Sequence, residues 1–235
     1  MDHIKAIFFD LDGTLRHNQP SGDQVFNDYL LELGLMISGE DMTRAQRWEH
    51  YYFANSPEIR ADQNQHVEPQ AFWLNFARRR LVALGCHPQQ AHSLAPKVSA
   101  YMNEHYKPRT NVPQEVFPLL ASIKERGYVL GVVSNREGPF YEELKELELD
   151  GYFRFALAGG EVDAFKPDPR IFEHALERAG TSAAETIYVG DNYFADILGS
   201  SRAGLVPVLF DPAGLFPEAD CAVIRSFHEF PALLT

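Results

Sequence analysis

The sequence predicts a doubly wound α/β domain that is interrupted by a long helical insertion. Two observations indicate this fold class. Short apolar segments alternate with amphipathic helical segments at the start of the chain and again from residue 110 onward, as is typical of a parallel sheet covered by helices on both faces. Between residues 16 and 110 the alternation stops and only helical patterns are found, so this stretch is predicted to be an insertion.

Five segments are predicted to be strands. The first, residues 4–11, is apolar apart from Lys5 and Asp10, as expected for a strand that is buried on both faces. The other four have the same apolar character, and the last of them is short: residues 129–133, 186–189, 206–210 and 222–224.

Two amphipathic helices are predicted between these strands. One covers residues 114–126 and precedes Gly127, and the other runs from Pro169 to Ala179 and precedes Gly180. Each has apolar residues at spacings of three and four, which place them on one helix face. Glycine commonly follows a helix end because it adopts a left-handed backbone without strain.

The insertion is predicted to be an all-helical domain. Its apolar spacing marks three helices, at residues 25–33, 72–84 and 94–102. The segment from Asn55 to Pro69 is polar and contains two prolines, so it is predicted to be a loop. The arginines at 78–80 point in different directions around their helix and are predicted to be solvated. The expected boundaries are 1–16 and 109–235 for the α/β core and 17–108 for the insertion.

The composition favours small soluble partners. Of 235 residues, 33 are acidic and 21 are basic, so a net charge of −12 repels nucleic acid and anionic membranes. The two cysteines, Cys86 and Cys221, lie far apart, and neither a disulfide framework nor a thiolate metal site is predicted. No segment has the pattern of a signal peptide or a membrane helix, so we expect a cytoplasmic protein. The sequence does not indicate an oligomeric state.

Two carboxylates stand at the end of the first strand. Residues two apart on an extended strand face the same side, so Asp10 and Asp12 are expected to point together into the crevice at the carboxyl end of the sheet. Close carboxylates repel each other unless a cation or a shared proton lies between them, and the pair therefore suits a divalent metal ion and acid/base chemistry. Taken alone, the pair also fits a solvated turn.

Polar residues suited to binding a phosphate or a metal ion are expected at the same edge. Some follow later strands and one precedes the helix at 169–179: Ser134, Asn135, Lys166, Asp191, Asn192 and Asp196. Each of them singly also fits an ordinary turn or a solvated side chain. Because all of these residues are expected at one edge of the sheet, together they favour a functional site over a set of unrelated turns.

These segments resemble, in order, the four motifs of the haloacid dehalogenase-like hydrolases. The segment from Asp10 to Leu15, Asp-Leu-Asp-Gly-Thr-Leu, is similar to motif one, and Ser134 in Val-Val-Ser-Asn is similar to motif two. Lys166 corresponds to motif three, and the segment from Gly190 to Asp196 to motif four. The resemblance covers the whole predicted core. It implies a Rossmann-like sheet and identifies the insertion as that family's helical cap.

The resemblance also implies a role for each motif residue in a Mg²⁺-dependent phosphatase that hydrolyses a small phosphate monoester. Asp10 would be the nucleophile that forms an aspartyl-phosphate, and Asp12 would be the acid/base. The remaining roles are phosphate binding by Ser134, Asn135 and Lys166, Mg²⁺ binding by Asp10, the Asp12 main-chain carbonyl and Asp191, and support by Thr14, Asn192 and Asp196.

Asp12 favours a phosphatase over a dehalogenase, because dehalogenases of this family typically replace the residue at that position. Residues 16–96 contain no lysine, which argues against a phosphonatase and weakens a sugar phosphomutase, whose cap usually supplies one. Two alternatives stay open: a phosphotransferase or phosphomutase of the same family, and a phospho-accepting binding module without turnover, similar to receiver domains.

The organic part of a small phosphorylated metabolite is expected to be recognised by residues of the cap and its linker. Arg16, Arg47 and Trp48 are the candidates, because arginine and tryptophan together suit an acidic or aromatic metabolite. The alternative for Trp48 is packing against other cap helices, with the arginines solvated.

Overall fold

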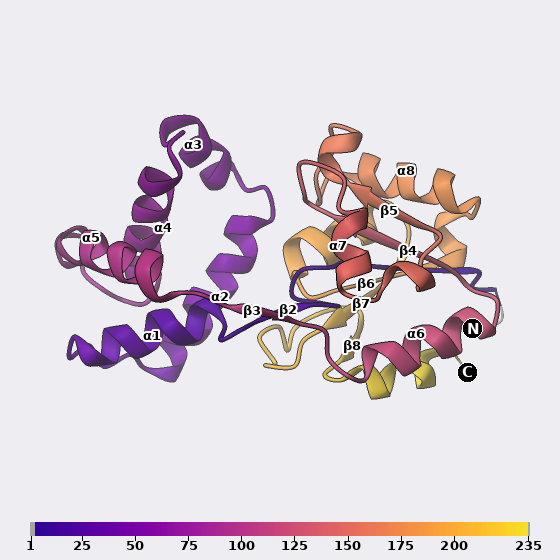
Figure 1. Cartoon of the computed structure of the whole chain (residues 1–235), viewed down its shortest axis with the longest axis horizontal. Helices are drawn as coiled ribbons and strands as arrows, with labels where there is room; N and C mark the ends of the chain where they lie inside the picture. The colour runs from indigo at the N-terminus through magenta and orange to yellow at the C-terminus, as the bar shows by residue number, and fades with distance from the viewer. Residues whose placement is uncertain (1–2, 235) are drawn as a thin grey trace. The chain divides into compact units, whose positions relative to one another are not determined.

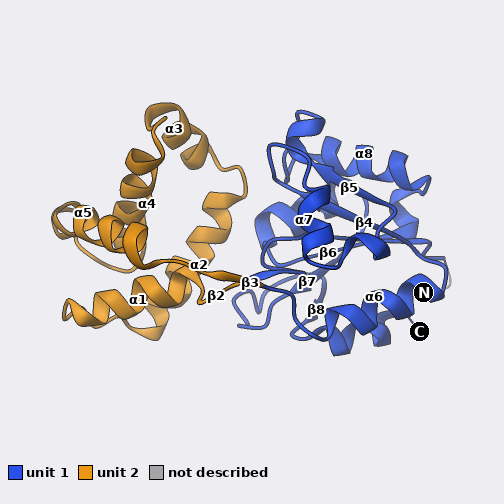
Figure 2. Ribbon diagram, in the orientation of Figure 1, with its two compact units in different colours: residues 1–17, 111–235 blue, residues 18–110 orange. Residues whose placement is uncertain are grey.

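The computed structural model describes residues 3–234 and consists of two compact units (Figures 1 and 2). The first unit comprises residues 1–17 and 111–235, and the second comprises residues 18–110. A two-stranded sheet of β2 (His17–Gln19) and β3 (Arg109–Asn111) is formed by the two segments that connect them. Among the described residues no helix is long and apolar enough to span a bilayer.

The first unit is built on a sheet of six parallel strands in the order β5-β4-β1-β6-β7-β8. The strands are β1 (Ala6–Phe9), β4 (Val129–Ser134), β5 (Phe155–Ala158), β6 (Thr186–Gly190), β7 (Val206–Phe210) and β8 (Ala222–Ile224). The chain leaves β1 toward β4 on one side and later returns to add β6 on the other. This reversal of strand order beside β1 is where open α/β sheets bind ligands.

Strand β1 is buried on both faces, as its apolar sequence predicts. Ile7 and Phe9 pack with α6 (Val116–Glu125) and the 3₁₀ helix η5 (Phe227–Leu234). Phe8, on the opposite face, packs with α8 (Pro169–Ala179). Alternate side chains of one strand therefore join two separate apolar clusters, and the predicted α/β class is confirmed.

All five predicted strands are present, and both predicted core helices form. Helix α8 has the predicted ends, with Asp168 accepting a hydrogen bond from the Arg170 N–H at the start and Gly180 in the left-handed conformation after the end. Smaller elements complete the unit: α7 (Tyr141–Glu146), α9 (Leu198–Arg202), a π-helical turn η4 (Tyr193–Ile197), and 3₁₀ turns η1 (Asp150–Tyr152), η2 (Gly159–Glu161) and η3 (Ala183–Glu185).

Edge strand β5 is not predicted by the sequence. Its four residues, Phe-Ala-Leu-Ala, are all apolar, but the run is short, two of its residues are alanine, which has little strand preference, and the first two residues are only half-buried. Phe155 fills the space opposite Gly131 in the neighbouring strand, where a Cβ on the glycine would lie 2.3 Å from the Phe155 ring. The strand thus depends on a tertiary fit that local pattern does not reveal.

The second unit contains five helices, shown in orange in Figure 2. They are α1 (Gly22–Glu32), α2 (Gly39–Phe53), α3 (Pro57–Gln65), α4 (Pro69–Ala83) and α5 (Pro88–His105). Most of the apolar residues that predict three of these helices form one buried cluster, with Phe26 and Leu30 from α1, Leu81 from α4 and Val98 from α5. The helical insertion is confirmed.

The prediction of a loop from Asn55 to Pro69 is wrong, because helix α3 occupies most of this segment. Pro57 begins this helix instead of breaking it: the first helical position needs no N–H donor, and proline is tolerated there. The Ser56 hydroxyl accepts a hydrogen bond from the Ile59 N–H, which caps the helix start. Proline is therefore misleading as a loop marker at this place.

The prediction that the arginines at 78–80 are solvated is wrong for Arg79 and Arg80. The side chain of Arg80 is only 3% exposed and pairs with Asp23 of α1 at 2.8 Å and with Glu49 of α2 at 2.6 Å. Arg79 pairs with Asp62 of α3 at 2.6 Å. Buried guanidinium groups are stable when carboxylates surround them, and these partners come from other helices.

Candidate active site

The ends of three neighbouring strands bring the motif residues together. Asp10 follows β1, Ser134 is the last residue of β4, and Asp191 follows β6. The register pairs Phe9 with Val132 on one side and with Val189 on the other, so the three strands end within two residues of one another. The expected meeting of polar residues at this edge is found in the structure.

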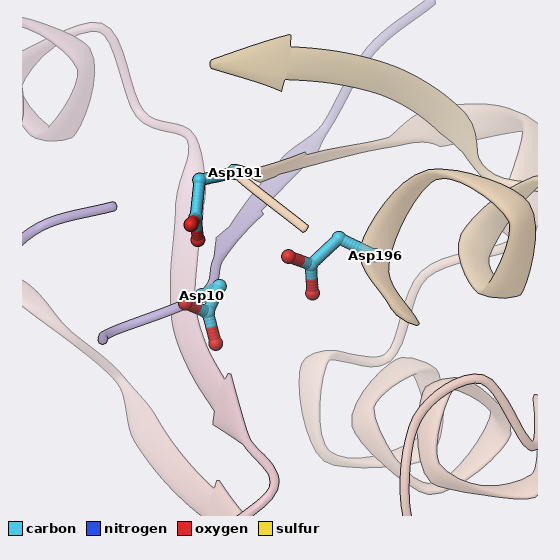
Figure 3. A group of neighbouring side chains, drawn as sticks. All are labelled: Asp10, Asp191 and Asp196. Atoms are coloured by element: carbon cyan, nitrogen blue, oxygen red, sulfur yellow. The ribbon is translucent and has the colours of Figure 1, made fainter. Parts of the chain in front are cut away.

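Three carboxylates form a compact acidic cluster. Asp10, Asp191 and Asp196 each offer one oxygen, and these oxygens lie within 4.8 Å of one another. Figure 3 shows Asp10 and Asp191 at the ends of adjacent strands and Asp196 reaching toward them from the helical turn η4. Three oxygen donors at this spacing fit a hard divalent cation. The cluster can therefore hold a metal ion.

Burial, together with charge repulsion within the cluster, raises the pKa values of two of its carboxyl groups. Burial raises the pKa of Asp10 to about 7, although the adjacent Lys166 acts to lower it, and the charge of Asp196 adds to the rise. Burial, followed by the charges of Asp10 and Asp196, holds the pKa of Asp191 well above its usual range. A cation would relieve this repulsion, which is why the donor set suits one.

Lys166 is the buried counter-charge of the cluster. Its side chain is 3% exposed, and its Nζ donates to Asp10 Oδ1 at 2.6 Å and to Asp196 Oδ1 at 2.7 Å. Burial alone would lower the pKa of Lys166, but the charges of Asp10 and Asp196 raise it well above its ordinary value. The ammonium is therefore charged at neutral pH beside the Asp10 carboxyl group.

Asn135 and Tyr188 hold Lys166 in place. The Asn135 side-chain oxygen accepts from the Lys166 N–H at 2.6 Å, and its Nδ2 donates to the Lys166 carbonyl at 2.8 Å. The Tyr188 hydroxyl lies 3.0 Å from Lys166 Nζ and 3.1 Å from the Val133 carbonyl. The side chain of Asn135 is thus engaged with the main chain of Lys166, and its phosphate contact stays a prediction. Tyr188, two residues before Gly190, is not found by sequence reasoning.

Thr14 and Gly13 join the first motif to the fourth. The buried Thr14 hydroxyl lies 3.1 Å from Asp191 Oδ1 and 3.4 Å from Asp10 Oδ2, and it accepts a hydrogen bond from the Asp191 N–H at 3.0 Å. Gly13 has a φ of +94°, and a Cβ there would lie 2.4 Å from Asp191 Oδ2. Only glycine allows this approach.

Asn192 supports Asp196. The side-chain oxygen of Asn192 accepts from the N–H groups of Phe194 and Ala195, both at 3.0 Å, and so caps the turn that carries Asp196. The Asn192 N–H in turn donates to Asp196 Oδ2 at 2.9 Å. These contacts fix the third carboxylate of the cluster through its backbone turn.

Asp12 lies in a separate group of charges, with its side chain 42% exposed. Arg16 Nε donates to its Oδ1 at 2.5 Å, and Arg136 donates Nε to Oδ2 at 3.0 Å and Nη2 to Oδ1 at 3.1 Å. Partial burial acts to raise the pKa of Asp12, but the bonds and charges of Arg136 and Arg16 lower it below its usual value. Arg136 is missed by sequence reasoning, although it stands two residues after Ser134.

Of the three substrate candidates, Arg16 belongs to the first unit and contacts Asp12. Arg47 and Trp48 lie on α2 of the second unit. The centroid of the Trp48 ring lies 5.0 Å from that of the Tyr52 ring and 5.8 Å from that of the Phe76 ring. Trp48 therefore packs among the aromatic side chains of the helical unit. The roles of these residues in substrate recognition stay predictions.

Comparison with known proteins agrees with this geometry. A family model described as haloacid dehalogenase-like hydrolase matches residues 7–209. The chain is 30% identical to a glyceraldehyde 3-phosphate phosphatase of Methanopyrus kandleri, over 87% of this chain and 83% of that protein. It is 29% identical to a phosphoserine phosphatase of Thermus thermophilus, over 92% and 91% of the two chains. The crystal structure of a 2-haloacid dehalogenase from Pseudomonas syringae pv. tomato matches with a TM-score of 0.56, at 26% identity and over 98% of each chain. These matches confirm the family resemblance, and the chain belongs to the haloacid dehalogenase-like hydrolases, a family of enzymes.

Proposed function

We propose that this protein is a Mg²⁺-dependent phosphatase that hydrolyses a small phosphate monoester through Asp10. The observation that carries the proposal is the buried contact of Lys166 with Asp10, at 2.6 Å, inside a cluster of three carboxylates. A nucleophilic carboxylate needs fixed orientation, and a phosphoryl group needs positive charge around its oxygens. Lys166 and a bound cation at the cluster meet both needs.

The protein's own residues account for each step of the reaction. Asp10 attacks phosphorus while the ester oxygen leaves, which transfers the phosphoryl group to the Asp10 carboxylate. Asp12, in its protonated form, gives its proton to the leaving oxygen and then takes one from the water that attacks the phosphorus of the aspartyl-phosphate, which restores the protonated form. The products are an alcohol and inorganic phosphate, and the Asp10 carboxylate is regenerated.

Mg²⁺, held by Asp10, the main-chain carbonyl of Asp12 and Asp191, would supply positive charge to the phosphoryl oxygens. The Ser134 hydroxyl and the Lys166 ammonium are assigned to binding the same phosphoryl group. Ser134 is buried at the end of β4, at the edge where Asp10 stands. This assignment gives every core motif a role around one phosphate.

Two features favour a phosphatase over the other reactions of the family. Asp12 is retained, and a dehalogenase has no leaving alkoxide that needs its proton. The two matched proteins that carry phosphatase names act on small phosphorylated metabolites, according to those names. We therefore assign a small phosphorylated metabolite as substrate, and we assign the choice among such compounds to residues of the cap.

The first experiment measures hydrolysis of p-nitrophenyl phosphate with Mg²⁺ by the wild type, Asp10→Asn and the control Asp220→Asn. Asp220 is an exposed aspartate of the same unit outside the cluster. We expect Asp10→Asn to lose activity by on the order of 10³-fold or more and Asp220→Asn to keep it. Undiminished turnover by Asp10→Asn would sink the nucleophile assignment.

The same assay, extended to a panel of phosphorylated metabolites, separates the alternatives. Release of inorganic phosphate supports the phosphatase. Transfer of phosphate between substrates without its release indicates a phosphotransferase or phosphomutase. A phosphorylated protein that persists for hours in Mg²⁺ without turnover indicates a phospho-accepting module.

A further inference from the structure

Arg136 connects the acid/base candidate to the rest of the core. Its guanidinium donates through Nε and Nη2 to both carboxylate oxygens of Asp12, at 3.0 and 3.1 Å. On its other side it donates through Nη2 to Glu143 Oε1 at 3.0 Å and through Nη1 to Glu143 Oε2. One planar group thus bridges two carboxylates that are 131 positions apart in the sequence, as the residue numbers show.

The guanidinium is itself fixed. Its central carbon lies 5.3 Å from the centroid of the Phe140 ring, and Glu143 belongs to helix α7. The Arg136 carbonyl accepts a hydrogen bond from the Gly160 N–H at 3.0 Å, which ties the loop after β4 to the 3₁₀ turn η2 that follows β5. The Phe140 ring and Glu143 of α7 therefore hold the Arg136 side chain, and the bond to Gly160 holds its main chain, so the guanidinium has a fixed orientation.

Asp12, by contrast, has little else to hold its side chain. It is 42% exposed, and its other described partner is Arg16, whose Nε donates to Oδ1 at 2.5 Å and also lies 3.5 Å from Glu143 Oε1. The two-bond fork from Arg136 is the contact that fixes the direction of the carboxylate plane, because a single bond leaves it free to rotate.

We infer that Arg136 is a positioning residue for Asp12, with Glu143 as its anchor. The inference rests on the proposed function, in which Asp12 must reach the ester oxygen and later a water. Arg136 acts through Asp12 and makes no contact of its own with the substrate. Loss of the fork therefore lowers the rate of the chemical step and leaves substrate binding unchanged.

The test compares kcat and KM for hydrolysis of an alkyl phosphate by Arg136→Gln, Arg136→Lys, Glu143→Gln and the control Glu142→Gln. Glu142 is on the same helix, is 81% exposed and pairs with Lys145. We expect kcat to fall on the order of 10- to 100-fold in Arg136→Gln with KM unchanged. Lysine should not restore the rate, because it lacks the planar fork. Glu143→Gln should show a smaller loss, and Glu142→Gln none.

A double-mutant cycle tests whether Arg136 acts through Asp12. In an Asp12→Asn background, Arg136→Gln should cause little further loss of kcat. An undiminished further loss, or a rise in KM at constant kcat, would mean that Arg136 acts on the substrate and would overturn the inference. Should Arg136→Gln fail to fold, the cycle of Glu143→Gln with Asp12→Asn carries the same test.

A crystallographic readout does not depend on turnover. The wild type should show Asp12 in one side-chain conformation on Arg136, and Arg136→Gln should show it displaced or in several conformations. An unmoved Asp12 in the variant would overturn the positioning role even in an active enzyme. Inactivity of the wild type on every phosphate ester would count against the proposed function instead, so the two failures are distinguishable.

Discussion

Replacement of Lys166 by methionine should strongly destabilise the core. The side chains of Lys166, Asp10 and Asp196 are 3%, 8% and 1% exposed, and the ammonium lies 2.6 and 2.7 Å from the two carboxylates. Methionine fills a similar volume but leaves two buried carboxylates without their cation. Removal of one partner from a buried ion pair costs about 3–5 kcal/mol.

This cost can be converted to a melting temperature. For a chain of this size, 1 kcal/mol corresponds to about 2–4 °C, so Lys166→Met should melt about 6–20 °C below the wild type in the absence of Mg²⁺. Scanning calorimetry or circular dichroism in a metal-free buffer measures the difference. The free energy of unfolding from urea titration gives an independent value.

Lys145→Met is the matched control. Lys145 pairs with Glu142 at 2.7 Å, but these side chains are 47% and 81% exposed. Solvent screens this pair, so it contributes little to stability and the control should melt within about 4 °C of the wild type. Equal melting temperatures for the two variants would refute the argument that burial makes the Lys166 contacts strong.

Three further predictions concern the metal, the first turn and the pH dependence of stability. Mg²⁺ should raise the melting temperature of the wild type, and Asp191→Asn should lose most of that shift; an equal shift in both would contradict a metal site at the cluster. Gly13→Ala should cost about 1–3 kcal/mol in a urea titration, since its φ is +94° and its Cβ would meet Asp191; an unchanged midpoint would contradict this. Hydrogen bonds from Lys5 and Ser182 lower the pKa of Glu185 to about 2, so its ionised form stabilises the fold above its usual pKa, and that advantage disappears as the pH falls through 2. The difference in melting temperature between the wild type and Glu185→Gln should therefore be present at neutral pH and vanish near pH 2, and a difference that does not change with pH would disprove it.

Local sequence patterns predict the parts of the fold that local forces determine. Helix α8 is predicted at both ends because Pro169 at its first turn and Gly180 after its end act on the backbone directly. Strand β1 is predicted because burial on both faces requires an unbroken apolar run. The meeting of Asp10 and Asp191 follows from the rule that parallel strands end at one edge, which holds for any order of the strands.

Contacts between distant segments are the parts that the pattern does not reveal. The sequence of its own helix predicts that Arg80 is solvated. Asp23 and Glu49, which neutralise its charge, belong to two other helices. Arg136 is missed because its partner Asp12 is 124 positions away. In both cases a charged side chain is kept by a tertiary partner, and only the folded chain shows which one.

The side-chain amide of Asn135 has a consequence for how the second and third motifs stay together. It gives and receives one hydrogen bond with the main chain of Lys166, as a peptide group of a neighbouring strand would. The side chain of Asn135 thus joins the segment after β4 to the segment that contains Lys166 with the same pair of bonds that strand pairing would supply. An aspartate there would retain the acceptor but lose the donor, and an alanine would lose both. The main chain that carries the Lys166 ammonium is therefore held by a residue whose side chain has no charge.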